Sequence, residues 1–218
     1  MEKIKSYLKA LSNKHNMKIM FIEAKYNKDI KGVLKKVKIK GKVGLLTTAQ
    51  HIHQLKEAQK IIKNSIIGGQ ILGCNFKNAE KIKNKVDCFL FIGSGDFHPL
   101  ELALKTGKEV YIANPYINQV SKIGKEDIEK KKKEIKGKYI KFLNAKKVGI
   151  LVSTKPGQYN LKKAIELRKK MKKESYIFIF NTLTEEELEN FPDIDIFINT
   201  ACPRIEYKKV INIDDIGI

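Results

Sequence analysis

Short apolar runs alternate with stretches of helical periodicity along most of the chain. Residues Cys88–Ile92 form a continuous apolar run, which is typical of a strand buried on both faces of a sheet. Near the amino end, by contrast, Ile4, Leu8 and Leu11 recur at helical spacing. Strands that alternate with helices of this length predict right-handed βαβ crossovers and a mostly parallel sheet. The predicted fold class is therefore α/β.

The same pattern sets approximate bounds for each element. Strands are expected at residues 18–23, 43–48, 65–68, 88–92, 109–113, 148–153, 176–180, 194–199 and 209–213. Helices are expected at residues 2–14, 29–37, 50–63, 78–85, 99–106, 121–144, 158–172 and 185–190.

These elements group into two consecutive small parallel-sheet βαβ domains, preceded by the remnant of a third. We expect the remnant of a first α/β domain at residues 1–41 and a central α/β domain at 42–120. A charged linking helix follows at 121–144, and a C-terminal α/β domain occupies 145–218. Similar units in one chain suggest duplication, although no strong residue-level repeat stands out.

Composition indicates a folded protein and argues against membrane-spanning, secreted and disulfide-rich classes of protein. Hydrophobic residues make up 42% of the 218 residues and charged residues 31%, which is enough to bury a core. No apolar run approaches the ~18 residues that a membrane span needs, and the amino end lacks the pattern of a secretion signal. Three cysteines do not make a disulfide framework. We therefore expect a cytoplasmic protein without a membrane segment.

The charge is strongly basic, with 44 Lys and Arg against 24 Asp and Glu, a net charge of +20. Such a balance indicates either a polyanionic partner such as RNA or a lysine-rich, solvated surface. Only Arg168 and Arg204 are arginines, whereas specific recognition of bases and phosphates usually recruits arginine. This composition favours the solvated surface.

Candidate chemistry lies in loops that follow the predicted strands, because ligands of parallel α/β units bind at the carboxyl ends of the strands. Five such loops stand out, at residues 47–51, 68–75, 93–99, 153–158 and 200–204. Each signal is weak alone. Gly93, Ser94 and Gly95 either offer backbone N–H groups to an anion or form a plain turn. His98 is either an acid/base group or a histidine at a helix start without a catalytic role.

Other familiar sites are disfavoured by spacing. Lys155 lies in a Lys-Pro-Gly sequence that lacks the spacing of a triphosphate-binding loop. His51 and His53 lie two residues apart on a predicted helix, so they diverge and cannot share one metal.

The three cysteines differ in their settings. Cys88 lies inside an apolar strand, where a thiol acts as a small hydrophobic group. Cys74 lies in a glycine-rich loop, and Cys202 follows a strand end. Both of these positions allow a thiolate to reach a cleft shared by two units, where it either binds a metal or cluster or has no such role.

Five segments in sequence order give a more specific signal. They are residues 69–75, 91–99, 114–116, 149–158 and 200–205. Together they resemble the archaeal and eukaryotic diphthamide synthesis enzymes, the 2-(3-amino-3-carboxypropyl)histidine synthases, over about residues 17–213.

The resemblance implies three similar α/β domains around a 4Fe–4S cluster, with one cysteine ligand from each domain. It implies cleavage of S-adenosylmethionine to a 3-amino-3-carboxypropyl radical, which is added to a histidine of translation elongation factor 2. Cys74 matches the second-domain ligand and Cys202 the third-domain ligand, whereas Cys88 matches none. The cleft is expected to be lined by Gly93, Ser94, His98, Lys155, Gln158 and Arg204.

The chain departs from this pattern because the first domain and its cysteine motif are missing. It is therefore expected to associate with itself or with a fuller family member. The sequence does not identify its electron donor. Three origins fit: a short natural subunit, a fragment, or a descendant with a new role. The function classes are a transferase subunit, a non-catalytic accessory subunit of that enzyme, and a basic module that binds RNA or ribosomes.

Overall fold

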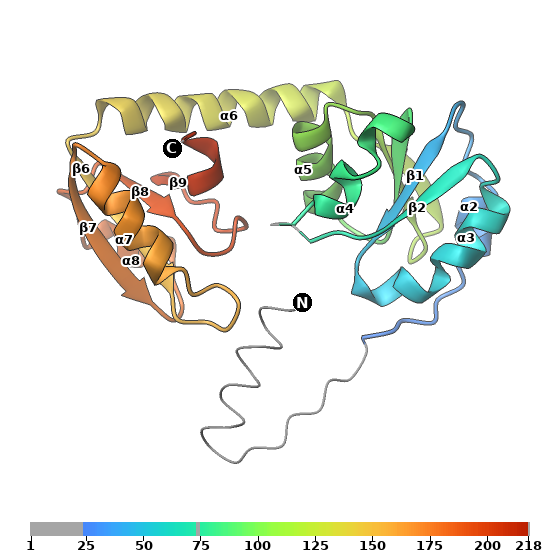
Figure 1. Ribbon diagram of the computed structural model, residues 1–218, viewed down its shortest axis with the longest axis horizontal. Helices are drawn as coiled ribbons and strands as arrows, with labels where there is room; N and C mark the ends of the chain where they lie inside the picture. Colours follow the sequence, from blue (N-terminus) through green and yellow to red (C-terminus); the bar gives the residue numbers. More distant parts are fainter. Residues whose placement is uncertain (1–23, 73–74, 218) are drawn as a thin grey trace, which may run out of the picture. The chain divides into compact units, whose positions relative to one another are not determined.

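The computed structural model describes residues 24–72 and 75–217, which fold into two compact units (Figure 1). Described residues up to 132 form one of them, the N-terminal unit, and residues from 133 form the other, the C-terminal unit. Helix α6 (Lys125–Asn144) begins in the former and ends in the latter. The helix expected at 2–14 and the strand expected at 18–23 lie outside the described residues.

The N-terminal unit is built on a five-stranded sheet with the order β2-β1-β3-β4-β5. The first four strands are parallel, and the edge strand β5 is antiparallel. Every residue of β1 and β3 is buried, which explains why β3 is a continuous apolar run and why β1 is apolar up to its last residue, Thr47. The strands are β1 (Val43–Thr47), β2 (Ser65–Gln70), β3 (Cys88–Ile92), β4 (Val110–Asn114) and β5 (Gln119–Lys122).

Helices cover both faces of this sheet (Figure 1). One face carries α2 (Lys31–Leu34) and α3 (Leu55–Ile61), and the other carries α4 (Lys77–Glu80) and α5 (Phe97–Thr106). Two segments expected to be α-helical are partly 3-10 helix. They are η1 (Ala49–Gln54), before α3, and η2 (Lys83–Lys85), after α4.

The segment before β1 packs into the core of the N-terminal unit. Ile30, Val33 and Leu34 are buried in the same cluster as Leu45 and Leu90 of the central strands. Residues 30–34 thus cover one face of this sheet, and the descent of residues 1–41 from a first domain stays a prediction.

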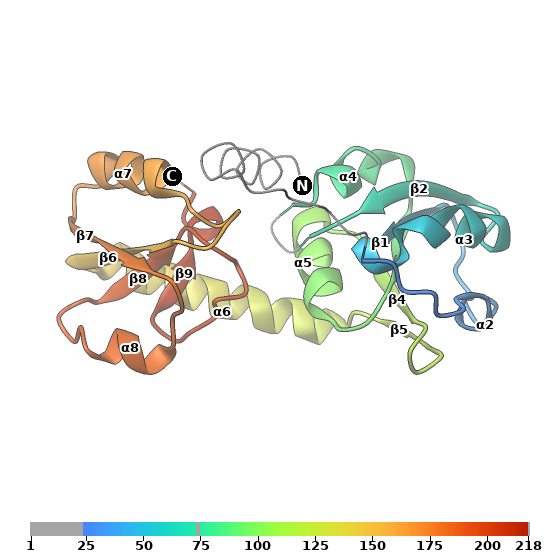
Figure 2. The same cartoon turned by 90° about the horizontal axis from the view of Figure 1, so that it is seen from below.

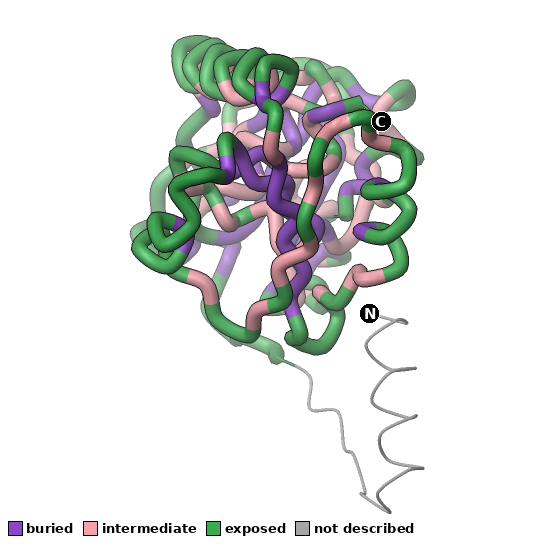
Figure 3. The backbone as a smooth tube through the Cα atoms, turned by 90° about the vertical axis from the view of Figure 1, so that its left-hand side faces the viewer, coloured by how far each residue is buried: buried purple, intermediate pink, exposed green. Residues whose placement is uncertain are grey.

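The C-terminal unit is a four-stranded parallel sheet with the order β7-β6-β8-β9. Helices α7 (Leu161–Lys170) and α8 (Glu185–Glu189) lie on opposite faces of the sheet (Figure 2). Buried residues follow the central strands, whereas the outer turns of the helices are exposed (Figure 3). The remaining elements are β6 (Lys147–Ser153), β7 (Glu174–Phe180), β8 (Ile196–Asn199), β9 (Val210–Asn212) and η3 (Ile213–Asp215). The mixed α/β fold with parallel-dominated sheets is therefore confirmed.

The two units share a packing arrangement at their central strands. In the N-terminal unit Gly44 pairs with Phe89, and in the C-terminal unit Gly149 pairs with Phe197. A Cβ atom on either glycine would lie closer than 3.0 Å to the ring of its paired phenylalanine, so both positions need glycine. This correspondence is a residue-level repeat that inspection of the sequence did not detect.

An aspartate before the second central strand repeats in the same way. The Oδ2 atom of Asp87 accepts a hydrogen bond from the Lys42 N–H at 2.6 Å. The Oδ2 atom of Asp195 accepts from the N–H groups of Lys146 and Lys147 at 2.8 and 2.9 Å. Each carboxylate therefore ties together the amino ends of two central strands.

The expected helix at 121–144 is wrong at its start, because residues 119–122 form β5 and the helix begins at Lys125. The chain turns tightly enough to pair Asn114 with Gln119. Asn118 makes this turn with a φ of 52°, a left-handed conformation that asparagine tolerates. Within the described residues, no helix has the length and apolar character needed to cross a bilayer.

The glycine beneath Phe197 gives a test of the central packing. Gly149→Ala should lower the free energy of unfolding by about 1–3 kcal/mol, because the added methyl forces Phe197 out of its position. Gly137→Ala is the control, since Gly137 lies in α6 with no neighbouring atom within 4 Å of the added methyl. The control should gain up to about 1 kcal/mol from helix propensity. Urea unfolding measures both, and equal effects of the two variants would contradict this packing.

Asp195 gives a test by pH. Hydrogen bonds from the Lys147 and Lys146 backbone N–H groups hold its pKa below the usual value of an aspartate. The stabilisation is thus present above the unfolded-state pKa of about 3.9 and is lost as the pH falls through the lower folded-state pKa. Asp195→Asn should be less stable than wild type at pH 6 and should lose less stability on acidification. Thermal melts between pH 6 and pH 2 measure this, and the neighbouring Asp193→Asn should keep the wild-type pH dependence.

Candidate functional site

Most of the candidate residues lie in loops at the carboxyl edges of the two sheets, as expected for a parallel α/β fold. In the N-terminal unit the loop after β3 carries Gly93 and Ser94, and His98 follows in the first turn of α5. In the C-terminal unit the loops after β6 and β8 carry the other described candidates. Because β6 and β8 are neighbouring parallel strands, their loops lie next to each other.

The loop after β3 is shaped by two glycines. Gly93 is buried with a φ of 154°, and a Cβ there would come within 3.0 Å of the Phe91 ring. Gly95 has a φ of 77°, which favours glycine. Ser94 is exposed between them. The turn thus holds a hydroxyl and backbone groups at the sheet edge. Its two glycines are explained by backbone conformation and close packing, which a turn without a ligand would also require.

His98 lies in the first turn of α5 and is half-buried. Its ring centroid is 6.0 Å from that of Phe91 and 5.3 Å from that of Phe97. The imidazole therefore packs against aromatic rings at the edge of the sheet.

An aromatic cluster at the same edge was missed by the sequence reasoning. The rings of Tyr26 and Tyr116 stack with centroids 5.1 Å apart, and each is 42% exposed. Both meet the ring of His51 edge to face, with centroids 5.9 Å away. The Asn-Pro-Tyr sequence after β4 was the only available signal, because the three rings come from separate parts of the chain.

His51 is oriented by Gln54. The Gln54 Nε2 donates to the Lys28 carbonyl at 2.9 Å, which directs Oε1 toward the histidine, so that Nδ1 of His51 donates to it at 2.8 Å. His51 is 1% exposed and its Nε2 has no hydrogen-bond partner among the described residues. His53 is exposed, so the two histidines differ in their surroundings as well as their direction.

Cys202 lies in the loop after β8 and is half-buried. Thr200, two residues before the cysteine, is held to the neighbouring strand β6, because its Oγ1 donates to the Leu151 carbonyl at 2.7 Å. From the next loop, Asn160 Nδ2 donates to the Thr200 carbonyl at 2.5 Å. The thiol thus sits on a loop that is fixed from two sides.

Lys155, Gln158 and Arg204 lie in these two adjacent loops. Lys155 and Arg204 are exposed, and Gln158 is half-buried. The Gln158 N–H donates to the Lys155 carbonyl at 3.0 Å, which closes the turn after β6. The structure therefore brings Lys155, Gln158, Cys202 and Arg204 to one edge of one sheet.

Of the other two cysteines, only Cys88 lies within the described residues. Cys88 is 4% exposed within β3, and burial raises the pKa of its thiol, so it belongs to the core as predicted. Cys74 lies outside the described residues. Within residues 24–72 and 75–217, no cluster of three or more His, Cys, Asp or Glu side chains is arranged to hold a metal ion.

Residues 8–211 match the diphthamide synthesis protein family. The chain belongs to this family. The 2-(3-amino-3-carboxypropyl)histidine synthase of Pyrococcus horikoshii is 38% identical over 184 residues, covering 77% of this chain and 52% of that protein. The enzyme of the same name from Methanocaldococcus jannaschii is 35% identical over 201 residues, covering 87% and 55%. The family resemblance drawn from the five segments is thus confirmed.

A solved relative agrees with this membership. The crystal structure of Dph2 from Pyrococcus horikoshii with a 4Fe–4S cluster matches with a TM-score of 0.75 and 33% identity. The match covers 88% of this chain and 62% of that one. The chain spans about half the length of the curated relatives that it matches.

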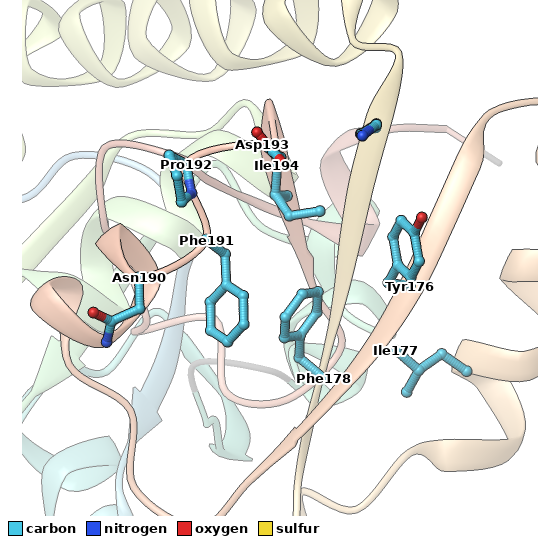
Figure 4. A pocket seen from close by; sticks show the side chains of 9 residues that line it. Tyr176, Ile177, Phe178, Asn190, Phe191, Pro192, Asp193 and Ile194 are labelled. Atoms are coloured by element: carbon cyan, nitrogen blue, oxygen red, sulfur yellow. The ribbon is translucent and has the colours of Figure 1, made fainter.

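One pocket of about 460 Å³ lies elsewhere in the C-terminal unit (Figure 4). Its lining includes Lys147, the first residue of β6, and Ile194, which precedes β8. The ring of Phe178 meets that of Phe191 edge to face in its wall, with centroids 4.7 Å apart. These positions are at the amino ends of the strands, opposite the edge that carries Cys202, so the pocket is separate from the candidate site.

Proposed function

We propose that the chain is a subunit of a 4Fe–4S-dependent enzyme that transfers the 3-amino-3-carboxypropyl group of S-adenosylmethionine to a histidine of translation elongation factor 2. The observation that carries this proposal is the placement of Cys202. Its thiol lies half-buried on a fixed loop at the carboxyl edge of a parallel sheet, in a relative of a protein that holds such a cluster. We place the protein in the cytoplasm with its substrate.

The donor chemistry fits an iron–sulfur cluster. Iron in these clusters takes thiolate ligands, and a thiol must be accessible to serve. Cys202 meets this requirement and the buried Cys88 does not. We assign Cys202 and Cys74 as ligands, the latter by its match to the family motif. The third thiolate of the family pattern would come from a fuller family member bound to this chain.

A cluster of this kind, when bound, would supply an electron and an open iron for cleavage of the sulfonium substrate. The residues of this chain bind and orient the substrate. Lys155 and Arg204 are exposed cations at the Cys202 edge, and we assign them to pair with the carboxylate of the methionine moiety. Gln158 offers an amide beside them. In the N-terminal unit, Gly93, Ser94 and His98 offer backbone, hydroxyl and imidazole groups at the carboxyl edge of its sheet.

The overall transfer is balanced in atoms and charge. The C–S bond to the aminocarboxypropyl group breaks, and sulfur leaves as a neutral thioether. A C–C bond forms at the carbon between the two imidazole nitrogens, and that carbon loses its proton together with the one electron that cleavage of the C–S bond consumed.

Replacement of single cysteines tests this function. Cys74→Ala and Cys202→Ala should each abolish S-adenosylmethionine-dependent modification of elongation factor 2, in the complex of this chain with a full-length family member in which the two matching cysteines are replaced. Each variant removes a thiolate that water or a neighbouring side chain replaces poorly. Cys88→Ala is the matched control, which should cost roughly 1 kcal/mol of stability and leave modification intact.

The outcomes distinguish the other two function classes. Full activity of both Cys74→Ala and Cys202→Ala in an active complex would make the chain a non-catalytic accessory subunit. Absence of modification in every complex, with RNA binding that weakens steeply as salt rises, would make it a basic RNA-binding module. Equal behaviour of all three cysteine variants would contradict the assignment of ligands.

A further inference from the structure

Asn199, the last residue of β8, uses its whole side-chain amide in the loop that carries Cys202. Its Nδ2 donates to the Cys202 carbonyl at 2.7 Å and to Asn212 Oδ1 at 2.8 Å. Its Oδ1 accepts the Ala201 N–H at 2.9 Å. Asn199 is 2% exposed, so these three bonds form with little competition from water.

These hydrogen bonds hold the loop backbone just before and just after the Cys202 side chain. The Cys202 carbonyl also accepts the Ile205 N–H at 3.0 Å, so the backbone at Cys202 is held by one donor from the end of β8 and one from within the loop. The neighbouring strand β9 adds support, because Asn212 pairs with Asn199 in register and its Nδ2 donates to the Pro203 carbonyl at 3.4 Å. The cysteine is therefore anchored to two strands through one amide.

Few other side chains can make this set of bonds. An aspartate lacks the two N–H donors, and a serine is too short to reach both partners. An aliphatic side chain would leave the Ala201 N–H and the Asn212 Oδ1 without these partners in a part-buried site, which is costly. Asparagine at this position therefore fits the loop by its chemistry.

We propose that Asn199 is a positioning residue, which fixes the Cys202 backbone so that the thiolate is held ready to bind iron. The inference rests on the proposed function for the role of the thiolate, and on the hydrogen bonds alone for the fixed loop. Metal ligands need such support, because a ligand on a mobile loop must be ordered when the metal binds.

The test compares the alkylation rates of Cys202 and Cys88 by iodoacetamide in the metal-free full chain, resolved by mass spectrometry of peptides. In Asn199→Ala, Cys202 should be alkylated about tenfold faster or more, because two hydrogen bonds to the loop and one to Asn212 of β9 are lost. Cys88 should keep its wild-type rate, since it reacts only when the core opens. Asn212→Ala should give a smaller increase in the alkylation rate of Cys202. This variant replaces Asn199→Ala in the test if Asn199→Ala does not fold.

Asn181→Ala is the matched control. Asn181 is exposed just after β7 at the same sheet edge, and its Oδ1 accepts from Thr154 Oγ1 at 3.3 Å. This variant should leave both alkylation rates unchanged. An unchanged Cys202 rate in the Asn199 or Asn212 variant would overturn the proposal. Equal acceleration of Cys202 and Cys88 would also overturn it, since the effect would then not be specific to the Cys202 loop.

Iron uptake separates this inference from the proposed function. After anaerobic reconstitution with a full-length family member in which the two matching cysteines are replaced, Asn199→Ala should bind less iron than wild type and Asn181→Ala the same amount. If the wild-type chain contributes to no iron binding, the proposed function fails, whereas the alkylation rates still decide whether Asn199 fixes the loop.

Discussion

The close approach of two central parallel strands determines much of the structure. In the C-terminal unit the Phe197 ring lies directly over Gly149, and in the N-terminal unit Phe89 lies over Gly44. A large ring over a bare backbone fills the core without separating the strands, and helices then cover both faces of the sheet. The carboxyl ends of these strands carry the candidate residues, so their positions depend on this packing.

Both units repeat this arrangement, but their chemistry has diverged at the strand ends. The strands β1 and β3 of one unit correspond to β6 and β8 of the other in sheet order and in the glycine–phenylalanine pair. After β3 the chain makes a glycine turn at Gly93, whereas after β8 it makes the Asn199-anchored loop with Cys202. A scaffold that repeats its core packing and varies its loops agrees with the general behaviour of α/β folds.

The sequence predicted the buried parts of the fold well and the polar contacts poorly. The bounds of β3 agree with the prediction, because a strand buried on both faces is a continuous apolar run. The edge strand β5 was missed, since its residues are largely exposed and resemble the charged helix that follows. Sequence motifs indicated Cys202, but not Asn199, whose role depends on side-chain bonds to β9 and the loop. The Tyr26–His51–Tyr116 cluster was missed for the same reason, because it joins distant segments.

The central claim is that this chain supplies thiolate ligands to an iron–sulfur cluster. It is tested most directly by anaerobic reconstitution with iron and sulfide, followed by measurement of bound iron and sulfide. We predict that wild-type chain with a full-length family member in which the two matching cysteines are replaced binds iron and sulfide in equal amounts. The same mixture with Cys202→Ala should bind little of either. Equal iron content with wild type and with Cys202→Ala, or none with wild type, would contradict the account.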